Sequence, residues 1–564
     1  MRTRTNRVAW TAGLGLAIAI GGATLMRAYA QVGKAQPQPT GIAVPLETVG
    51  NHLQVDPLLV AQAAEAWTVI GRKDNPVWPG WNAADTPILI YMPGVQDLLI
   101  NHPQPPMGFT RYEGPIRFPH GKMWVKNGET IEKLDGQNTA RKVNGVDTLM
   151  IADSLSTRRQ WIEGIIEQAR RSSDDLKSTI DGGLFQNPYD SMAIFAHEAF
   201  HVYQRKRTPQ KGGNELALMD YPSLSVENNV GYSLEADALR AAIGAKDPTD
   251  LRKFAVQWLA IRQARRKVLS QALNDYEDGT EFNEGTAKYV EFRFIQALEK
   301  RKPSPDMWFV QGFRGYDDLS AERERILNRM CEMMEGKVNV NNDPYGASPV
   351  RMRLYFSGMG VGALLDRLGA KWHDRVFEPK TTLTALAEEA IHATPLELQV
   401  AYAEVANSQR LKDLSAEKQQ LAKDGQAHID KALEEFDKAP GVVVLDYSTL
   451  SKPKVGLGFT PFGILRIDAD RTLFRLLPLR GIVNEMGFQE DSARPVLQDR
   501  PKKQFVLMLK EAVTEAKLDE LAPNWRSGPV KIESLKLPGV VLKNVNASIK
   551  LEGRRLIIKA RDVS

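Results

Sequence analysis

The sequence predicts an α+β protein with a small mixed sheet, a mainly helical body and a β-rich C-terminal part. Strand-like runs separated by turn residues occur up to Ala152, helical patterns dominate from Leu216 to Ala401, and short alternating runs follow Pro440. The chain has 564 residues, which is too long for one hydrophobic core. We therefore expect two or three domains.

Residues 1–30 have the parts of a secretory signal peptide. A basic start precedes an apolar run from Val8 to Met26, and the small-x-small site Ala28-Tyr29-Ala30 follows it. A run of about 19 residues is also long enough to remain as a single membrane anchor with its basic end inside. The glycine- and alanine-rich composition and the processing site favour cleavage. Under either interpretation the bulk of the chain is exported, to the periplasm or the medium.

The composition is that of a soluble globular protein without a nucleic-acid partner. The formal net charge is +5, but four of the 74 basic residues lie in the N-terminal segment. The other 70 nearly balance the 69 acidic residues, so nothing indicates nucleic-acid binding. Cys331 is the only cysteine, which excludes an intramolecular disulfide and a cysteine-ligated zinc. Its apolar neighbours predict a place in a core helix.

The region 47–405 contains the predicted sheet and most of the predicted helices. It follows a proline-rich lead, 31–46, that we expect to be extended. Periodicity and turn residues predict the elements of the region in order. They are a helix over 56–70, strands over 87–92 and 147–152, and helices over 155–171, 232–245, 251–273, 282–300, 321–334, 352–368 and 383–390.

Two further segments complete the chain. Residues 406–439 are rich in Lys, Glu, Gln and Asp with sparse apolar positions, which predicts an exposed helix or charged linker. Residues 440–564 alternate apolar and polar positions and are expected to form a separate β-rich domain. Because this region has no histidine or cysteine, a packing or docking role is favoured over chemistry. Its strands are predicted over 442–445, 463–467, 505–509, 547–551 and 555–558, the last two joined as a hairpin through Glu552-Gly553.

The stretch His197-Glu198-Ala199-Phe200-His201 is a complete H-E-x-x-H motif. Residues four apart lie on one face of a helix, so His197 and His201 can bind one metal ion. Glu198 then lies beside the open position of the metal, where it could take a proton from zinc-bound water. Pro188-Tyr189-Asp190-Ser191 offers a helix start ahead of the motif. The pattern therefore predicts a Zn²⁺ site and a hydrolase.

Catalytic zinc has three protein ligands as a rule, so the motif needs a partner elsewhere. The residues after His201 exclude a third histidine at the H-x-x-G-x-x-H spacing, which leaves a carboxylate from a later helix, as in gluzincins. Glu235 is one candidate, in a segment that resembles the E-x-x-A-D helix of the CAAX-prenyl-protease type. In that family the ligand lies four residues before the aspartate, Asp237, and Ser233 occupies this position. Glu235 and Asp237 are also candidate partners of the histidines, or solvated helix carboxylates.

Glu284 is the favoured third ligand. The segment Asn283-Glu284-Gly285-Thr286-Ala287-Lys288-Tyr289-Val290-Glu291 is similar to the N-E-G-x-A-x-Y-x-E helix of aminopeptidase-N and related thermolysin-like proteins, whose first glutamate binds zinc. Gly285 and Ala287 would let this helix pack closely against the H-E-x-x-H helix. The long spacing from His201 and the absence of a G-x-M-E-N signature argue against an aminopeptidase. Glu291 is expected to be a structural charge.

A third resemblance concerns Tyr355. The segment 354–369 is similar to the Y-x-x-G helix that follows E-G-x-A-x-Y in bacterial proteins of the peptidase MA-like group. The resemblance implies that Tyr355 polarises the scissile carbonyl and stabilises the oxyanion. The alternative is that Tyr355 is a core aromatic in an apolar helix.

These resemblances, which cover roughly residues 190–390, imply a zincin-like body over 47–405 that acts as an exported zinc-dependent peptidase. His197, His201 and Glu284 would hold Zn²⁺, and Glu198 would serve as general base on a peptide or protein substrate. The strand over 147–152 would align an extended peptide by edge addition. The alternatives are a catalytically silent binding or scaffold protein of the cell envelope and a zinc hydrolase of a non-peptide bond.

Overall fold

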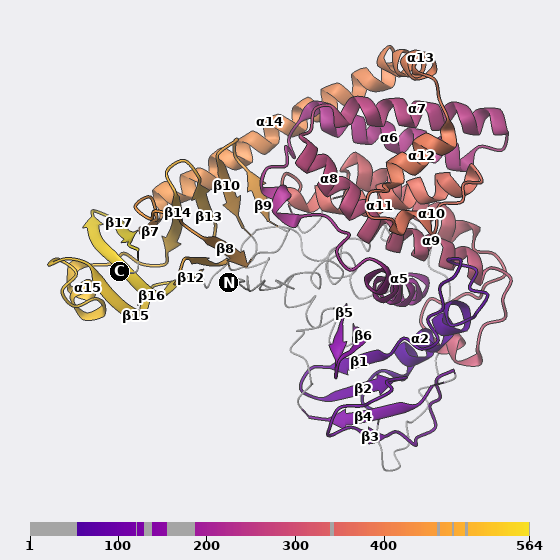
Figure 1. Cartoon of the computed structure of the whole chain (residues 1–564), viewed down its shortest axis with the longest axis horizontal. Coiled ribbons are helices and arrows are strands. Elements are labelled where there is room, and N and C mark those ends of the chain that lie inside the picture. Colours follow the sequence, from indigo (N-terminus) through magenta and orange to yellow (C-terminus); the bar gives the residue numbers. More distant parts are fainter. Residues whose placement is uncertain are drawn as a thin grey trace, which may run out of the picture.

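The computed structural model describes residues 53–119, 121–128, 138–154, 187–338, 343–458, 463–475, 479–490 and 494–562. Within these ranges the protein is a mixed α+β structure with a helical body and a β-rich C-terminal part, as predicted (Figure 1). The expected signal segment and lead, 1–46, and the helix expected over 155–171 lie outside the described residues. None of the helices in the described ranges has the length and apolar character that a membrane crossing requires.

The N-terminal part consists of helix α2 (Pro57–Ile70) and a six-stranded mixed sheet. Asp56 caps α2 by accepting a hydrogen bond from the Leu58 amide, and Pro57 occupies the first turn, where no amide is needed. The sheet has the order β3-β4-β2-β1-β6-β5, and β1 and β6 are its one parallel pair. Its strands are β1 (Ile88–Met92), β2 (Gln96–Ile100), β3 (Thr110–Arg111), β4 (Met123–Asn127), β5 (Thr139–Val143) and β6 (Val146–Ala152).

Strand β6 lies inside this sheet, with β1 on one side and β5 on the other. The expectation that 147–152 offers a free edge to a peptide was therefore wrong. The cause is a tight hairpin at Asn144-Gly145, whose positive φ angles of 44° and 79° fold β5 back onto β6. Within the described residues β5 is the edge strand on this side of the sheet.

The helical body differs from the sequence predictions in three places, one of which is helix α13 (Pro395–Ala406), which was not predicted. The single helix expected over 251–273 is two helices, because the chain turns at 267–270 and Arg266 then donates a hydrogen bond to the Asn274 carbonyl of the returning helix. The helix expected over 282–300 begins with a π-helical segment, η3 (Glu281–Gly285). The body contains α5 (Pro188–Arg207), α6 (Val226–Gly244), α7 (Pro248–Arg266), α8 (Gln271–Thr280), α9 (Thr286–Leu298), α10 (Ser320–Glu335), α11 (Ala347–Arg367), α12 (Leu383–Ile391) and α13 (Pro395–Ala406), with short turns η2 (Glu215–Met219), η4 (Pro305–Phe309) and η6 (Arg375–Phe377).

The segment expected to be an exposed helix or linker is the 30-residue helix α14 (Gln409–Lys438). Figure 1 shows it passing from the helical body to the β-rich part. One of its faces is buried: the Lys418 ammonium donates to the Glu335 carbonyl at the end of α10 at 2.7 Å, and Gly425 faces the Leu224 side chain. Helix α14 is thus docked on the body rather than exposed on all sides.

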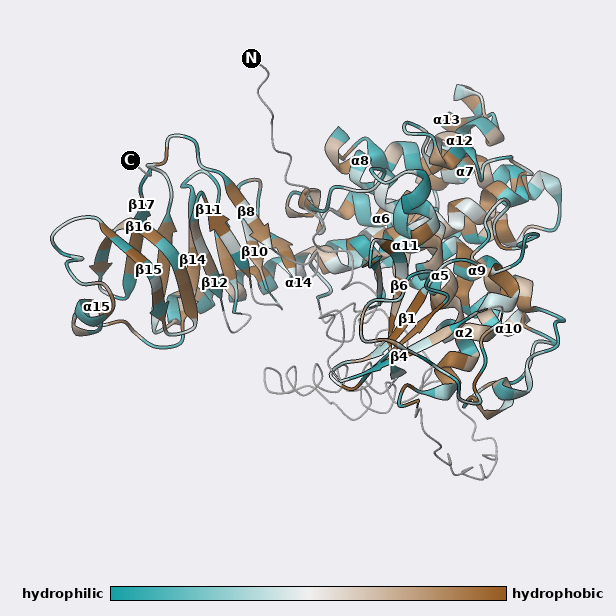
Figure 2. Cartoon of the chain, turned by 60° about the horizontal axis from the view of Figure 1, so that its bottom comes forward, coloured by the Kyte–Doolittle hydropathy of each residue, from teal (hydrophilic) through white to brown (hydrophobic). Residues whose placement is uncertain are grey.

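The C-terminal part is an 11-stranded sheet that carries the predicted β16–β17 hairpin. Strand β7 buries both of its faces: Val442 packs with Ile429 and Phe436 of α14, and Val443 belongs to the main core. Figure 2 shows apolar residues along these strands. The strands are β7 (Gly441–Asp446), β8 (Val455–Gly458), β9 (Ile464–Arg466), β10 (Arg471–Phe474), β11 (Arg480–Val483), β12 (Met486–Glu490), β13 (Val496–Asp499), β14 (Gln504–Leu509), β15 (Val530–Leu537), β16 (Val540–Glu552) and β17 (Arg555–Ala560), with one helix, α15 (Glu515–Leu521).

Candidate metal centre

Two helical segments bring His197, His201 and Glu284 together in the interior of the body. Helix α5, which begins after its cap residue Asn187, presents both histidines on one face, and η3 presents Glu284 opposite them. The two histidine Nε2 atoms lie 3.1 Å apart. The Glu284 Oε2 atom lies 3.6 Å from Nε2 of His197 and 3.5 Å from Nε2 of His201. All three side chains are buried, so the described residues contain one group that could hold a metal ion.

These three distances suit one tetrahedral metal ion. Zinc bonds of about 2.0–2.1 Å place the ligand atoms of a tetrahedron about 3.3–3.4 Å apart. The nearest point equidistant from the three observed atoms lies in their plane, about 2.0 Å from each, so bonds of about 2.0–2.1 Å would reach all three atoms from a position slightly out of that plane. The side chains therefore already have the separations that a shared metal requires.

Hydrogen bonds on the far side of each imidazole decide which nitrogen faces the centre. Nδ1 of His197 donates to Oε1 of Glu291 at 2.7 Å, and Nδ1 of His201 donates to Oε1 of Gln204 at 2.7 Å. Both acceptor atoms are oxygens, so each Nδ1 carries a hydrogen, and in the neutral form of each imidazole Nε2 presents a lone pair. Two lone pairs and one carboxylate oxygen therefore converge on the same point.

Gln204 also holds the segment that carries Glu284. Its amide nitrogen donates to the carbonyls of Phe282 and Asn283 at 3.0 Å and to the Thr286 hydroxyl at 2.8 Å. A π-helical turn interrupts the regular ladder of helical hydrogen bonds, and such turns are frequent at functional sites. One side chain thus binds a histidine ligand and the backbone beside the carboxylate ligand.

The second oxygen of Glu284 is held by Arg351 of α11. Nη2 of this buried arginine donates to Oε1 of Glu284 at 3.1 Å, whereas Oε2 accepts no hydrogen bond from any described residue. Burial opposes ionisation of Glu284, but Arg351 and the two histidines keep its pKa well below the usual range. Glu284 is therefore a carboxylate with one oxygen directed at the centre.

Gly285 permits a close helix contact, but with a different partner from the one expected. A Cβ at Gly285 would lie 2.6 Å from Cα of Gly358 and 3.0 Å from the Leu354 carbonyl oxygen, both on α11. The prediction that the helix carrying this segment packs against the H-E-x-x-H helix is confirmed by the contact of α9 with α5, but the role given to Gly285 in that contact was wrong. The glycine pair brings η3 to α11, which carries Arg351 and Tyr355.

The converging acceptor atoms require a positive charge between them. Burial lowers the pKa of His197, but the carboxylates of Glu284 and Glu291 outweigh this effect and raise it to about 10. Without a metal, His197 therefore holds a second proton at neutral pH. A divalent cation could replace that proton and bond all three atoms at once.

Glu198 and Tyr355 lie at the same centre. Glu198 is buried, burial raises the pKa of its carboxyl, and its Oε1 atom accepts no hydrogen bond from a described residue. The Tyr355 ring stacks on the His197 ring, with centroids 6.3 Å apart. Its hydroxyl accepts a hydrogen bond from Arg351, and burial raises its pKa, so the phenol keeps a proton that it can donate.

Glu235 and Asp237 do not take part in this site. Both carboxylate oxygens of Glu235 pair with buried arginines, with Arg262 at 2.9 Å and Arg265 at 2.5 Å. Asp237 pairs with Arg410 at 2.8 Å. The alternative that Glu235 is the third ligand was therefore wrong, and neither acid is a partner of the histidines.

Three residues of the centre were misjudged or missed by sequence reasoning. Glu291, expected to be a structural charge, accepts the hydrogen bond from His197. Gln204 and Arg351 were not identified. A sequence signal existed for both, because Gln204 lies three residues after His201 and Arg351 four residues before Tyr355, on the same helical faces.

Comparisons with known proteins assign no family to this chain. No protein-family model matches it, and no curated protein or solved structure does either.

Proposed function

We propose that the protein is an exported, zinc-dependent peptidase with a zincin-like body of the gluzincin type. The observation that carries this proposal is the convergence of His197 Nε2, His201 Nε2 and Glu284 Oε2, with distances of 3.1–3.6 Å, beside the buried carboxyl group of Glu198. Two imidazoles and one carboxylate form the ligand set of catalytic zinc in several peptidases. A purely structural zinc site has no need for an acid at position 198.

Each side chain has a distinct part in the proposed reaction. A bound zinc ion supplies an acidified water molecule and polarises the scissile carbonyl. Glu198 removes the proton from the attacking water and later delivers it to the leaving amine, for which its raised pKa is suited. Tyr355 donates a hydrogen bond to the oxygen that becomes negatively charged, and Arg351 directs the Tyr355 hydroxyl.

Strand β5 is the element that we propose to align the substrate. Among the described residues it is the outermost strand on this side of the sheet, and we propose that an extended peptide adds beside it. Arg205, four residues after His201, donates to the carbonyl of Ala140 in β5 at 2.5 Å. This contact connects the edge strand directly to the helix that carries the histidines.

The decisive experiment compares the wild type with Glu198→Gln. We expect the purified wild type to contain about one zinc per chain and to cleave a peptide library in a chelator-sensitive manner, with Glu198→Gln retaining zinc and losing cleavage. Asp190→Asn, on the same helix, is the control and should leave both unchanged. Undiminished cleavage by Glu198→Gln would refute the mechanism. A wild type that binds zinc and cleaves no peptide would favour a scaffold protein or a hydrolase of another bond.

A further inference from the structure

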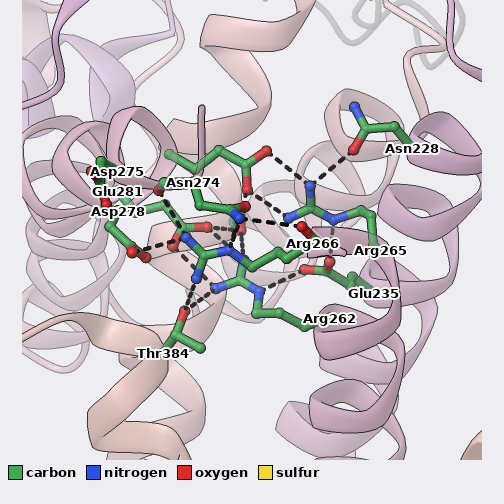
Figure 3. Close-up of polar contacts among 12 residues, drawn as sticks. Asn228, Glu235, Arg262, Arg265, Arg266, Asn274, Asp275, Asp278, Glu281 and Thr384 are labelled. Carbon is green, nitrogen blue, oxygen red and sulfur yellow. Dashed lines mark hydrogen bonds and ion pairs between the residues drawn. The ribbon is translucent and has the colours of Figure 1, made fainter. Parts of the chain in front are cut away.

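A cluster of buried charges lies beside the metal centre and takes no part in the proposed reaction. Arg262 and Arg265, on one helix, α7, are packed among the carboxylates of Glu235, Glu277 and Glu281, and each of the five residues is at most 3% exposed. Figure 3 shows the two guanidinium groups close together, with Glu235 bonded to both. Burial of so many charges requires that nearly all of their hydrogen bonds be satisfied.

The cluster has two halves that share Glu235. In one half Arg265 donates two hydrogen bonds of 2.8 Å to Glu277 of α8. In the other half Arg262 donates to both oxygens of Glu281, at 3.1 and 2.5 Å, as Figure 3 shows. Glu277 and Glu281 are equally buried, and each accepts two hydrogen bonds from one arginine. They differ in position, because only Glu281 belongs to η3.

Glu281 is the first residue of η3, and the candidate ligand Glu284 follows three positions later. Ser357 of α11 donates to Glu281 and accepts a hydrogen bond of 2.7 Å from Arg262. Ser357 lies two residues after Tyr355 and one before Gly358, whose backbone touches Gly285. Arg262 therefore joins the segment that carries the carboxylate ligand to the helix that carries Arg351 and Tyr355.

We propose that Arg262, Glu281 and Ser357 form a positioning device for the metal ligand Glu284. This proposal rests on the proposed metal centre and assigns none of the three residues a direct contact with metal or substrate. Gln204 of α5 holds η3 on one side by donating to two backbone carbonyls of η3. On the other side, Arg262 of α7 holds the start of η3 through its ion pair with Glu281. Together they fix the distance between Glu284 Oε2 and the histidines.

The required precision explains why a buried ion pair is placed here. Metal–ligand distances tolerate deviations of only about 0.2 Å, whereas a π-helical turn lacks the regular ladder of hydrogen bonds that would fix it. An ion pair with two hydrogen bonds fixes both the distance and the direction of the segment. Removal of the pair should therefore weaken metal binding more than a comparable loss elsewhere in the cluster.

The test is a comparison of Glu281→Gln with Glu277→Gln, two isosteric changes four residues apart. Both should lower the midpoint of thermal unfolding, because each leaves a buried arginine with a weaker partner. Only Glu281→Gln should lower zinc affinity, by about 10- to 100-fold in competition with a chromophoric chelator, and change the visible spectrum of the Co²⁺-loaded protein. Glu277→Gln should remain within about twofold of the wild type in affinity and keep its Co²⁺ spectrum.

A milder pair of variants covers the case in which Glu281→Gln does not fold. Ser357→Ala removes one hydrogen bond to Glu281. Ser348 lies on the same helix, and Ser348→Ala removes its hydrogen bond to Asp343, which precedes that helix. Only Ser357→Ala should weaken zinc binding. Equal effects of the two members of either pair, or unchanged affinity in Glu281→Gln, would overturn the positioning role alone. A wild type that binds no metal would overturn the proposed function together with it.

Discussion

Gly285→Ala tests whether the contact between η3 and α11 sets the metal centre. Gly285 has helical angles, φ −67° and ψ −39°, so alanine suits the backbone and would by itself favour the helix by about 0.5–1 kcal/mol. The added Cβ, however, would lie 2.6 Å from Cα of Gly358, where ordinary contacts begin at 3.4 Å. This atom and the Leu354 carbonyl oxygen, at 3.0 Å, are both backbone atoms, so neither can turn away as a flexible side chain could.

The size of the effect follows from this overlap. To restore contact, η3 and α11 must separate by about 1 Å, which costs about 1–3 kcal/mol in a packed interior. The same displacement is several times the tolerance of about 0.2 Å for a metal–ligand distance. We expect Gly285→Ala to unfold at a lower temperature and to bind zinc about 10- to 100-fold more weakly than the wild type.

Thermal unfolding by calorimetry and zinc competition with a chelator measure the two effects separately. Gly244→Ala is the control, because its Cβ would meet only the end of the Arg240 side chain, at 3.5 Å. This variant should be as stable as the wild type or slightly more stable, with unchanged zinc affinity. Wild-type zinc affinity in Gly285→Ala would refute the argument that this contact positions Glu284.

Three further predictions concern the same centre. Because the pKa of His197 is raised to about 10, zinc must displace a proton from His197 below that pH, so the apparent zinc affinity should rise about tenfold per pH unit between about pH 6 and 9. Titration calorimetry in buffers of different ionisation enthalpy should detect about one released proton per zinc bound. Detection of no released proton would contradict the role of His197 as a ligand. Gln204→Leu should lower zinc affinity about 10- to 100-fold, while Lys206→Ala on the same helix should not; equal affinities of the two variants would exclude the proposed role of Gln204. With free zinc at one hundred times its Kd, the free energy of unfolding should be about 2.7 kcal/mol higher than after a chelator has removed the zinc. A melting temperature that does not change with the chelator would show that zinc does not bind the folded state.

The parts of the site that were predictable from sequence are those set by local periodicity. The spacing of His197 and His201 on one helix, and Glu198 beside them, follows from 3.6 residues per turn. The helix start predicted at Pro188 is likewise the start of α5, and the structure adds Asn187 as its cap. Glu284 was reached through a resemblance of its segment, which local physics alone would not supply.

The roles of the other acids depend on tertiary packing and were not predictable in this way. Glu235, Glu281 and Glu291 are all helical carboxylates, but the first two meet buried arginines and the third meets His197. Which partner an acid meets is decided by helices distant in the sequence. The π-helical turn at 281–285 was missed for a related reason, because a periodicity of 3.6 residues predicts only a regular helix there.

The docking of α14 bears on how this protein can be divided. Its 30 residues span about 45 Å, and Ile429 and Phe436 pack against β-strand residues that belong to the C-terminal part. A chain ended at residue 440 would leave this apolar side of α14 bare and prone to aggregate. A fragment intended to retain only the metal centre would also have to remove the second half of α14. Lys418, which closes the end of α10, should stay in that fragment.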